Sequence, residues 1–471
     1  MKWRFKSIPV YVKAWGGQNM LIRLILIILF FGSASCSPNL PFLSQQAEPQ
    51  KSSKEAVVNS IDKINTKETK GEKLEIDPRL TKILKSPSLI ANKKNIEAAQ
   101  KTVLIVKSQT EPVVTAISNI GPKLDNDDLD LDATGGLSVT KLISDGGVVR
   151  AMSSSAELNV RASELLYAQN INSQLMEVVK AEQAIINFGK IEAIYNEQLA
   201  VYNDNLPLIQ TAAKANIISK TDVLKLEQLK LKSEESYLTA KTGADAAQLI
   251  RKKYNLNNND NYFTIDLKKW KSVEGKLTKN NFINIQLIET QIHILEKDIE
   301  AIEAQYLANV ALAGTATANV TDIDNSLGFV GLNISLPVKD GGKKNFQIQE
   351  KKMQIEALKQ QKADISLLKT TSYKAIQNFQ KIYELRSKLL SSQIENSKVI
   401  SEYIELKLRA GTASVIDLAT EKMNFYDLRS QGIALEYQNI NEIINFYQDI
   451  GYQCDLTELC DQINLVTISN R

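Results

Sequence analysis

Few residues of this chain have the types and spacing that catalysis requires. The one histidine, His293, lies in a stretch with helical character and has no nucleophile motif beside it. No glycine-rich phosphate loop occurs either, and the paired carboxylates fall on helix faces that we expect to contact solvent. We therefore predict a protein that is not an enzyme and that has no catalytic residues, no cofactor and no metal site.

Two of the three cysteines lie close together near the C-terminus. Cys454 and Cys460 can pair across a short loop if the chain is exported to an oxidising compartment, and we predict this disulfide. Zinc is not expected here, because two thiols and one distant histidine do not complete a ligand set.

The third cysteine, Cys36, follows a segment with the features of an export signal. Basic residues precede an apolar run over residues 24–31, and small residues from Gly32 to Ser35 separate that run from the cysteine. This order predicts a signal peptide over residues 1–35. The small residues also resemble a lipoprotein processing site, so we predict acylation of Cys36, with ordinary signal cleavage near it as the alternative.

Composition favours long helices and argues against nucleic acid as a partner. The 57 basic and 54 acidic side chains nearly cancel, so the chain lacks the positive excess that a phosphate backbone requires. Only 10 residues are proline, and alanine, leucine, isoleucine, lysine and glutamate are abundant. Residues 36–86 are rich in polar residues with weak periodicity, and we expect an anchor and a flexible spacer there.

A duplication organises the remaining chain. Residues 136–147 recur as residues 331–342, and residues 215–222 recur as residues 410–417, both at an offset of 195. An unchanged offset over so long a stretch predicts two copies of one structural unit with helices of equal length. The predicted division is residues 87–280 for the first repeat, 281–465 for the second and 466–471 for a C-terminal tail.

Each repeat is predicted to begin with a short helix and two strands. The short helices cover about residues 88–102 and 281–304. Alternation of apolar and polar residues predicts strands with one apolar face. It is regular in residues 310–319 and 332–338, less clean in residues 137–141, and noisier in residues 103–120.

An Asp-Gly-Gly motif follows the second strand of each repeat. Its residues are Asp145, Gly146 and Gly147 in the first repeat, and Asp340, Gly341 and Gly342 in the second. The glycines permit a sharp change of direction, and the aspartate can accept hydrogen bonds from the first amides of a helix. We predict strand-to-helix turns with no further role.

Long helices follow these turns. The first helices are predicted to cover residues 148–206 and 343–400, and each is followed by a second helix, ending near residues 253 and 448. A helix of about 55 residues is about 80 Å long, so it must pack sideways on its neighbours. Apolar residues at seven-residue spacing predict coiled-coil packing. They are Ile217, Leu224, Leu231 and Leu238 in the first repeat, and Ala419, Tyr426, Ile433, Ile440 and Tyr447 in the second.

This duplicated order of strands, turn and long helical hairpin resembles the TolC-like outer membrane efflux protein family over residues 87–465. The resemblance implies an α+β fold, in which long antiparallel helices form a coiled-coil tunnel. The resemblance also implies a homotrimer that shares a twelve-stranded membrane β-barrel, with four strands per protomer. The resemblance further implies a passive channel in the outer membrane with a long periplasmic part, serving a tripartite efflux pump or a type I secretion system.

The resemblance also implies partners at the two helical-hairpin tips. In the family these tips dock a periplasmic adaptor, or membrane fusion protein, and through it an inner membrane transporter. The matching residues are Asn216, Ile217 and Ser219 at the first tip, and Gly411, Thr412 and Ser414 at the second. Asn216 replaces the usual glycine, and asparagine tolerates a left-handed conformation better than most residues.

Two aspartates just beyond the tips, Asp222 and Asp417, match positions that line the closed periplasmic entrance in some family members. Three copies of each would form a ring that favours cations. Both residues are equally suited to capping the helices that begin there. The alternative function is a coiled-coil lipoprotein adaptor or surface fibre without a pore, although a fibre needs no duplicated strands.

Overall fold

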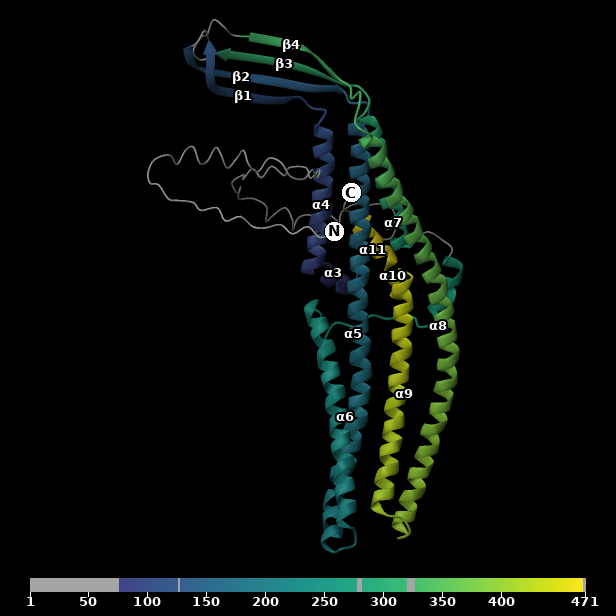
Figure 1. Cartoon of the computed structure of the whole chain (residues 1–471). Helices are drawn as coiled ribbons and strands as arrows, with labels where there is room; N and C mark the ends of the chain where they lie inside the picture. The colour runs from purple at the N-terminus through teal and green to yellow at the C-terminus, as the bar shows by residue number, and fades with distance from the viewer. Residues whose placement is uncertain (1–75, 126–127, 278–281, 320–326, 469–471) are drawn as a thin grey trace, which may run out of the picture. The chain divides into compact units, whose positions relative to one another are not determined.

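Four long helices form two antiparallel hairpins, α5 with α6 and α8 with α9 (Figure 1). The structure is a computed structural model and describes residues 76–125, 128–277, 282–319 and 327–468. The hairpin helices are α5 (Val148–Lys214), α6 (Lys220–Lys253), α8 (Lys343–Arg409) and α9 (Val415–Asp449). Both α5 and α8 contain 67 residues, and they start 195 positions apart. The duplication in the sequence is therefore also a duplication of structure.

The first helix of each hairpin extends further than predicted. The predicted end of α5 near residue 206 is wrong, because the helix continues through Pro207 to Lys214. A proline inside a helix removes a hydrogen bond and costs about 3 kcal/mol. Ile209 is only 5% exposed, so apolar burial continues past the proline and offsets part of this cost. Similarly, α8 passes its predicted end near residue 400 and stops at Arg409.

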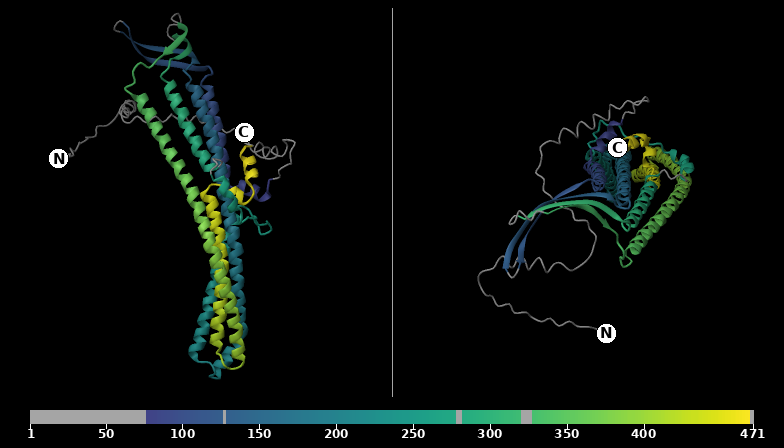
Figure 2. Two further views of the ribbon diagram at one scale, coloured as in Figure 1. Left: turned by 90° about the vertical axis from the view of Figure 1, so that its right-hand side faces the viewer. Right: turned by 90° about the horizontal axis from the view of Figure 1, so that it is seen from above.

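A four-stranded antiparallel sheet lies at one end of the helices (Figures 1 and 2). Its strands, in spatial order, are β1 (Val113–Asp125), β2 (Asp128–Ser144), β3 (Asn309–Asn319) and β4 (Leu327–Ser335). The first repeat supplies β1 and β2, and the second supplies β3 and β4. Because β2 is hydrogen-bonded to β3, the sheet joins the two repeats side by side.

A shorter helix precedes the strands of each repeat. These helices are α4 (Pro87–Ser108) and α7 (Ile283–Ala304), each of 22 residues. The predicted start of the first strand at residue 103 is wrong, because α4 continues to Ser108 and β1 starts only at Val113. Val103 and Val106 are buried on one face of α4 in a cluster with Ala156 of α5. This packing outweighs the preference of valine for strands.

The largest apolar core surrounds the middle of α5. Segments at the ends of the repeats contribute to it: α3 (Pro78–Leu84), the 3-10 helix η1 (Lys269–Lys276), α10 (Gln453–Leu456) and α11 (Cys460–Ile468). Leu80 and Ile83 of α3 are fully buried there, so the flexible spacer predicted over residues 36–86 is too long. The predicted tail from residue 466 is also wrong, because α11 continues to Ile468. Cys36 and the predicted signal peptide lie outside the described residues.

A buried ion pair fastens the segment after α6 to α5. Glu182 of α5 lies 3.2 Å from Arg251 of α6, and both side chains are almost fully buried. The other Glu182 oxygen accepts a hydrogen bond from the Phe263 amide at 2.7 Å, and Arg251 donates to the Asp260 carbonyl at 2.8 Å. Burial raises the pKa of the Glu182 carboxyl to about 7, although the Phe263 amide and the Arg251 guanidinium act to lower it. Two charged side chains thus position the backbone between α6 and α7.

Candidate functional site: hairpin tips and a two-faced sheet

The two helical-hairpin tips lie at the same end of the helices, opposite the sheet (Figure 1). Each turn contains one residue with a left-handed backbone, Asn216 with φ 56° at the first tip and Gly411 with φ 73° at the second. At both tips the next amide, of Ile217 or Thr412, donates to a carbonyl five residues earlier at 2.9 Å. Asparagine and glycine therefore build the same turn, because both accept positive φ.

A serine caps the second helix of each hairpin. Ser219 and Ser414 accept hydrogen bonds from the amides of Asp222 and Asp417, each at 3.1 Å. Their hydroxyls donate to the carboxylates of the same two aspartates, each at 2.7 Å. At the second tip the Asp417 carboxylate also accepts from the Ser414 amide at 3.0 Å, which completes a capping box. The hydrogen bonds from Ser414 hold the pKa of Asp417 below its usual range.

Asp417 thus takes part in a helix cap, one of the two roles that its position suggested, whereas the Asp222 carboxylate accepts the hydroxyl of the capping Ser219. The hydroxyls of the capping serines bond Oδ2 of each carboxylate. The Asp222 side chain remains 33% exposed, and Asp417 is exposed. Each tip therefore keeps a carboxylate next to solvent. A pore-lining role for the two aspartates stays a prediction. The tip residues predicted to dock an adaptor are also exposed, Ile217 to 78%.

The Asp-Gly-Gly turns connect strand and helix with the same geometry in both repeats. Oδ1 of Asp145 accepts the Gly147 amide and Oδ1 of Asp340 accepts the Gly342 amide, each at 2.9 Å. Oδ2 of each aspartate accepts an amide in the first turn of the long helix. The glycines have φ values from 67° to 101°, a left-handed region that glycine enters without steric cost.

The two faces of the sheet differ in chemistry. Neighbouring residues of a strand point to opposite faces, so two adjacent rows across the sheet sample both. One row is Val114, Val139, Gly314 and Val330. The next row is Thr115, Ser138, Thr315 and Phe329. Leu312 and Leu332 are also paired, and they lie on the same face as the three valines of the first row. Val330 and Leu332 are 79% and 61% exposed. One face is therefore mainly aliphatic and exposed, with Lys141 paired to Leu312 on it, and the other combines threonine and serine hydroxyls with apolar side chains such as Phe329.

Both outer strands of the sheet are edges. The order β1-β2-β3-β4 leaves β1 and β4 each paired on one side only among the described residues. An edge strand presents unpaired amide and carbonyl groups, which another strand can complete.

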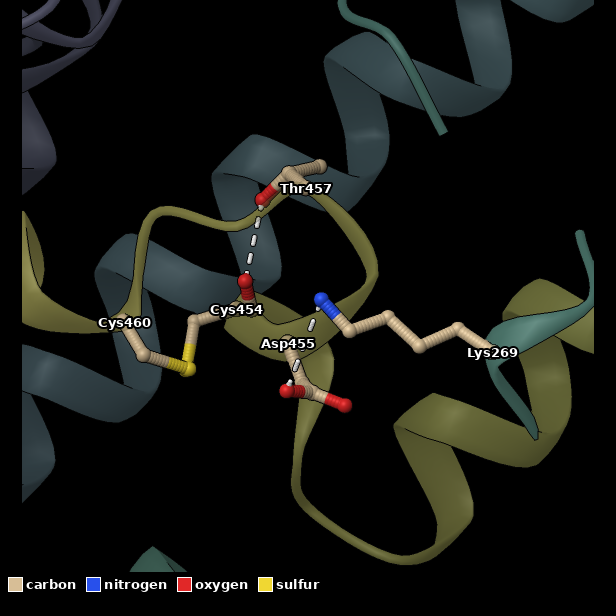
Figure 3. Close-up of a disulfide and its surroundings, with 5 residues drawn as sticks. All are labelled: Lys269, Cys454, Asp455, Thr457 and Cys460. Atoms are coloured by element: carbon tan, nitrogen blue, oxygen red, sulfur yellow. Dashed lines mark hydrogen bonds and ion pairs between the residues drawn. A yellow bond between two sulfur atoms is a disulfide. The ribbon is translucent and has the colours of Figure 1, made fainter. Parts of the chain in front are cut away.

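A disulfide joins Cys454 and Cys460 at the C-terminal end of the fold (Figure 3). Their Cα atoms are 4.7 Å apart across a separation of six residues. Thr457 donates to the Cys454 carbonyl at 3.3 Å, and Lys269 lies 3.9 Å from Asp455. The disulfide joins α10 to the start of α11, which packs on α5.

Other candidate chemistry is sparse in the part of the chain that the structure describes. His293 is exposed and lies 2.9 Å from Glu296 of the same helix. No group of three or more histidine, cysteine, aspartate or glutamate side chains there could hold a metal ion. None of the described helices is both long and apolar enough to cross a membrane.

Polar side chains that the sequence patterns do not single out link the two hairpins. Asp427 of α9 accepts hydrogen bonds from Tyr195 of α5 at 3.1 Å and from Lys232 of α6 at 3.0 Å. Glu197 of α5 lies 3.1 Å from Arg429 of α9. The charges themselves are visible in the sequence, but their pairing depends on the register between helices of different repeats.

Comparison with solved structures identifies this arrangement. The Campylobacter jejuni CmeC outer membrane channel matches with a TM-score of 0.67 and 13% identity, covering 93% of this chain and 98% of that chain. The outer-membrane channel OprN matches with a TM-score of 0.64 and 18% identity, covering 80% and 91%. The Neisseria gonorrhoeae MtrE outer membrane channel matches with a TM-score of 0.63 and 17% identity, covering 79% and 89%. The chain has a TolC-like fold. No protein-family model and no curated protein sequence matches it.

The TolC-like fold distributes the candidate residues along its length. The tips and the two-faced sheet lie at opposite ends of the same helices (Figure 1).

Proposed function

We propose that this chain is the protomer of an outer membrane channel that serves a tripartite efflux pump or a type I secretion system. Three copies form the channel, which conducts substrates passively from the periplasmic machinery to the exterior. The hairpin tips face the periplasm and dock an adaptor that connects to an inner membrane transporter. Cys36 anchors the mature chain in lipid.

The two-faced sheet with two open edges is the observation that carries this proposal. An exposed aliphatic face is costly in water and favourable against lipid. Strands can cross a bilayer only in a closed barrel, because lipid satisfies no backbone hydrogen bonds. Four strands are too few for closure, so we infer that three copies join β1 to β4 and form twelve strands. The hydroxyl-bearing face then lines the lumen.

Asp222 and Asp417 are the proposed gate residues. In a trimer both tips surround the axis, and three copies of each carboxylate would give the entrance a cation preference and a place where divalent cations block current. The lowered pKa of Asp417 supports this role, because its carboxylate stays ionised at neutral pH.

Single-channel recording of the mature protein in planar bilayers tests the function. The variants are Asp222→Asn and Asp417→Asn, which remove charge and retain a polar side chain of similar size. Asp364→Asn, at an exposed position of α8 away from the tip, is the matched control. We expect a cation-preferring conductance in the parent and the control, with reduced preference or loss of divalent-cation block in the tip variants.

Two other outcomes would change the conclusion. If the conductance, its cation preference and its block by divalent cations are the same in the tip variants as in the parent, the protein is a channel but the two aspartates do not form its gate. No conductance from folded, membrane-inserted trimers would overturn the channel and favour a lipid-anchored coiled-coil adaptor or surface fibre.

A further inference from the structure

The sheet face that carries Val139 and Val330, here called the aliphatic face, contains one charged residue. The pairing of Lys141 with Leu312 places this lysine on the aliphatic face, since residues two apart on a strand share a face. Over the residues that the structure describes, the other positions of this face in the four strands are uncharged. Lys141 is therefore a lone cation on a mainly apolar surface.

The neighbours of Lys141 on this face are apolar and open to their surroundings. Leu312 of β3 pairs with it, and Leu332 of β4 pairs with Leu312. Val139 lies two positions before it on β2, and Ile143 follows two positions after. These four side chains are 41% to 61% exposed. Lys141 is itself exposed, and none of the described carboxylates forms an ion pair with it.

The position of Lys141 in the sheet leaves it uncovered by protein. β2 is an inner strand, between β1 and β3, so copies that join edge to edge through β1 and β4 do not cover the middle of the aliphatic face. The fold does not require a cation at this level either. The equivalent residue of the second repeat, at the offset of 195, is Leu336, which is 56% exposed.

Lys141 lies at the end of the aliphatic face that is nearer the helices. β2 ends at Ser144 and leads through the turn at Asp145 into α5 (Figure 1). In the other direction, the odd-numbered residues of β2 from 139 back to 129, which share the parity of Lys141, are all uncharged. A tilted strand needs about 9–11 residues to cross the hydrocarbon core of a bilayer, and residues 129–139 match this length. In the membrane orientation of the proposed function, Lys141 therefore lies at the periplasmic surface of the bilayer.

We propose that Lys141 binds the phosphate of an anionic phospholipid of the periplasmic leaflet, with an acyl chain of that lipid along Val139, Leu312 and Leu332. The proposal rests on the membrane channel of the proposed function and identifies one lipid contact of its sheet. Lysine has a long apolar stem, so the stem can follow aliphatic side chains while the ammonium reaches the head groups. A cation on the lipid-facing side of a strand is costly at the midplane of the bilayer and nearly free at its surface. Anionic head groups attract lysine, because they contain no cation that neutralises the phosphate.

Lipid titration followed by native mass spectrometry tests this site. The mature protein in detergent is titrated with phosphatidylglycerol and, in parallel, with phosphatidylcholine, whose choline neutralises its phosphate. We expect the parent to prefer phosphatidylglycerol. Lys141→Leu, which introduces the residue type of the second repeat, should weaken phosphatidylglycerol binding about fivefold and leave phosphatidylcholine binding unchanged. Lys141→Arg should retain the preference. Lys352→Leu, at an exposed position of α8, is the matched control and should bind both lipids as the parent does.

A second measurement separates this inference from the proposed function. Leu137→Trp places a fluorophore on the aliphatic face, and Ser138→Trp places one on the opposite face. In vesicles of lipids with brominated acyl chains, the emission of Leu137→Trp should be quenched more than that of Ser138→Trp, with the parent as background.

Quenching of Leu137→Trp, together with equal phosphatidylglycerol binding by the parent and Lys141→Leu, overturns the lipid site and leaves the membrane channel in place. Equal loss of the preference in Lys352→Leu also overturns the site, because binding then depends on total charge. If Leu137→Trp is not quenched, the aliphatic face does not contact lipid, and both the lipid site and the proposed channel are wrong.

Discussion

The first helices of the two hairpins have equal length but different surroundings. α5 packs against α4, α6, α7, α9 and α11, whereas α8 packs against α7 and α9. Figure 2 shows α8 at the border of the helices and α5 among them. Six residues of the 67 in α8 are buried, including Lys369. Duplication thus preserved helix length and turn geometry. The position of each helix in the tertiary structure decided which of its faces are buried. The predictions below compare equivalent positions of the two repeats.

The largest difference is expected at Glu182 and its equivalent in the second repeat, Gln377. Glu182→Ala leaves Arg251 buried without its carboxylate partner, and loss of one member of a buried pair costs about 3–5 kcal/mol. Gln377 is only partly buried, so Gln377→Ala should cost about 1 kcal/mol or less. Denaturant titration of the detergent-solubilised proteins measures both free energies of unfolding. Equal costs would show that the ion pair adds nothing beyond side-chain packing.

The disulfide distinguishes the end of the second repeat from the end of the first, which has the ion pair instead. Replacing Cys454 and Cys460 together by alanine should lower the free energy of unfolding by about 2–3 kcal/mol, because a short loop is no longer closed in the unfolded chain. A reductant should destabilise the parent by the same amount and leave the variant unaffected. A parent that is insensitive to reductant would contradict this prediction.

Gln174 of α5 and Lys369 of α8 occupy equivalent positions in the long helices, and each contacts the start of a short helix, α4 or α7. Gln174 is hydrogen-bonded to Ser86 and Ser88, each at 2.6 Å. Lys369 is 1% exposed, its Nζ has no hydrogen-bond partner, and it lies 3.6 Å from the centroid of the Phe282 ring. Burial lowers the pKa of Lys369 to about 8. Lys369→Met should therefore stabilise the protein at pH 7 by about 2 kcal/mol, because it removes a buried charge with no hydrogen-bond partner.

The pH dependence gives this comparison a second test. The folded pKa of Lys369 lies below its ordinary value of 10.5, so between about pH 8 and 10.5 the unfolded chain binds more protons than the folded chain. Stability of the parent should rise with pH through this window. Lys369→Met should remove that rise. If the stability of the variant still rises with pH through this window, another titrating group causes the rise.

The smallest effects are expected at the helix caps of the tips. Ser219→Ala and Ser414→Ala should each cost about 1 kcal/mol. The cost at Ser414 should be larger by a few tenths of a kcal/mol, because only that tip has the reciprocal bond from its amide to the aspartate. Thermal unfolding of the two variants in parallel measures the difference. A larger loss at Ser219 would reverse the proposed order of the two caps.

Local sequence determined the turns and the element order. The Asp-Gly-Gly motifs, Asn216 and Gly411 occur where the backbone needs positive φ, and this requirement depends on the nearest residues alone. The offset of 195 predicted two equal hairpins, and the structure has them. The TolC-like fold predicted from these landmarks is confirmed by the solved structures.

Tertiary structure decided the features that depend on neighbours far along the chain. Residues 103–108 are helical because Val103 and Val106 pack on α5, and α3 forms where a flexible spacer was predicted because Leu80 and Ile83 reach the core. The Glu182–Arg251 pair and the links through Asp427 join residues of different helices. Leu231 of α6 and Tyr426 of α9 occupy equivalent positions at the offset of 195. Only the packing of α5 on α9 determines that Tyr426 is covered, while Leu231 stays exposed.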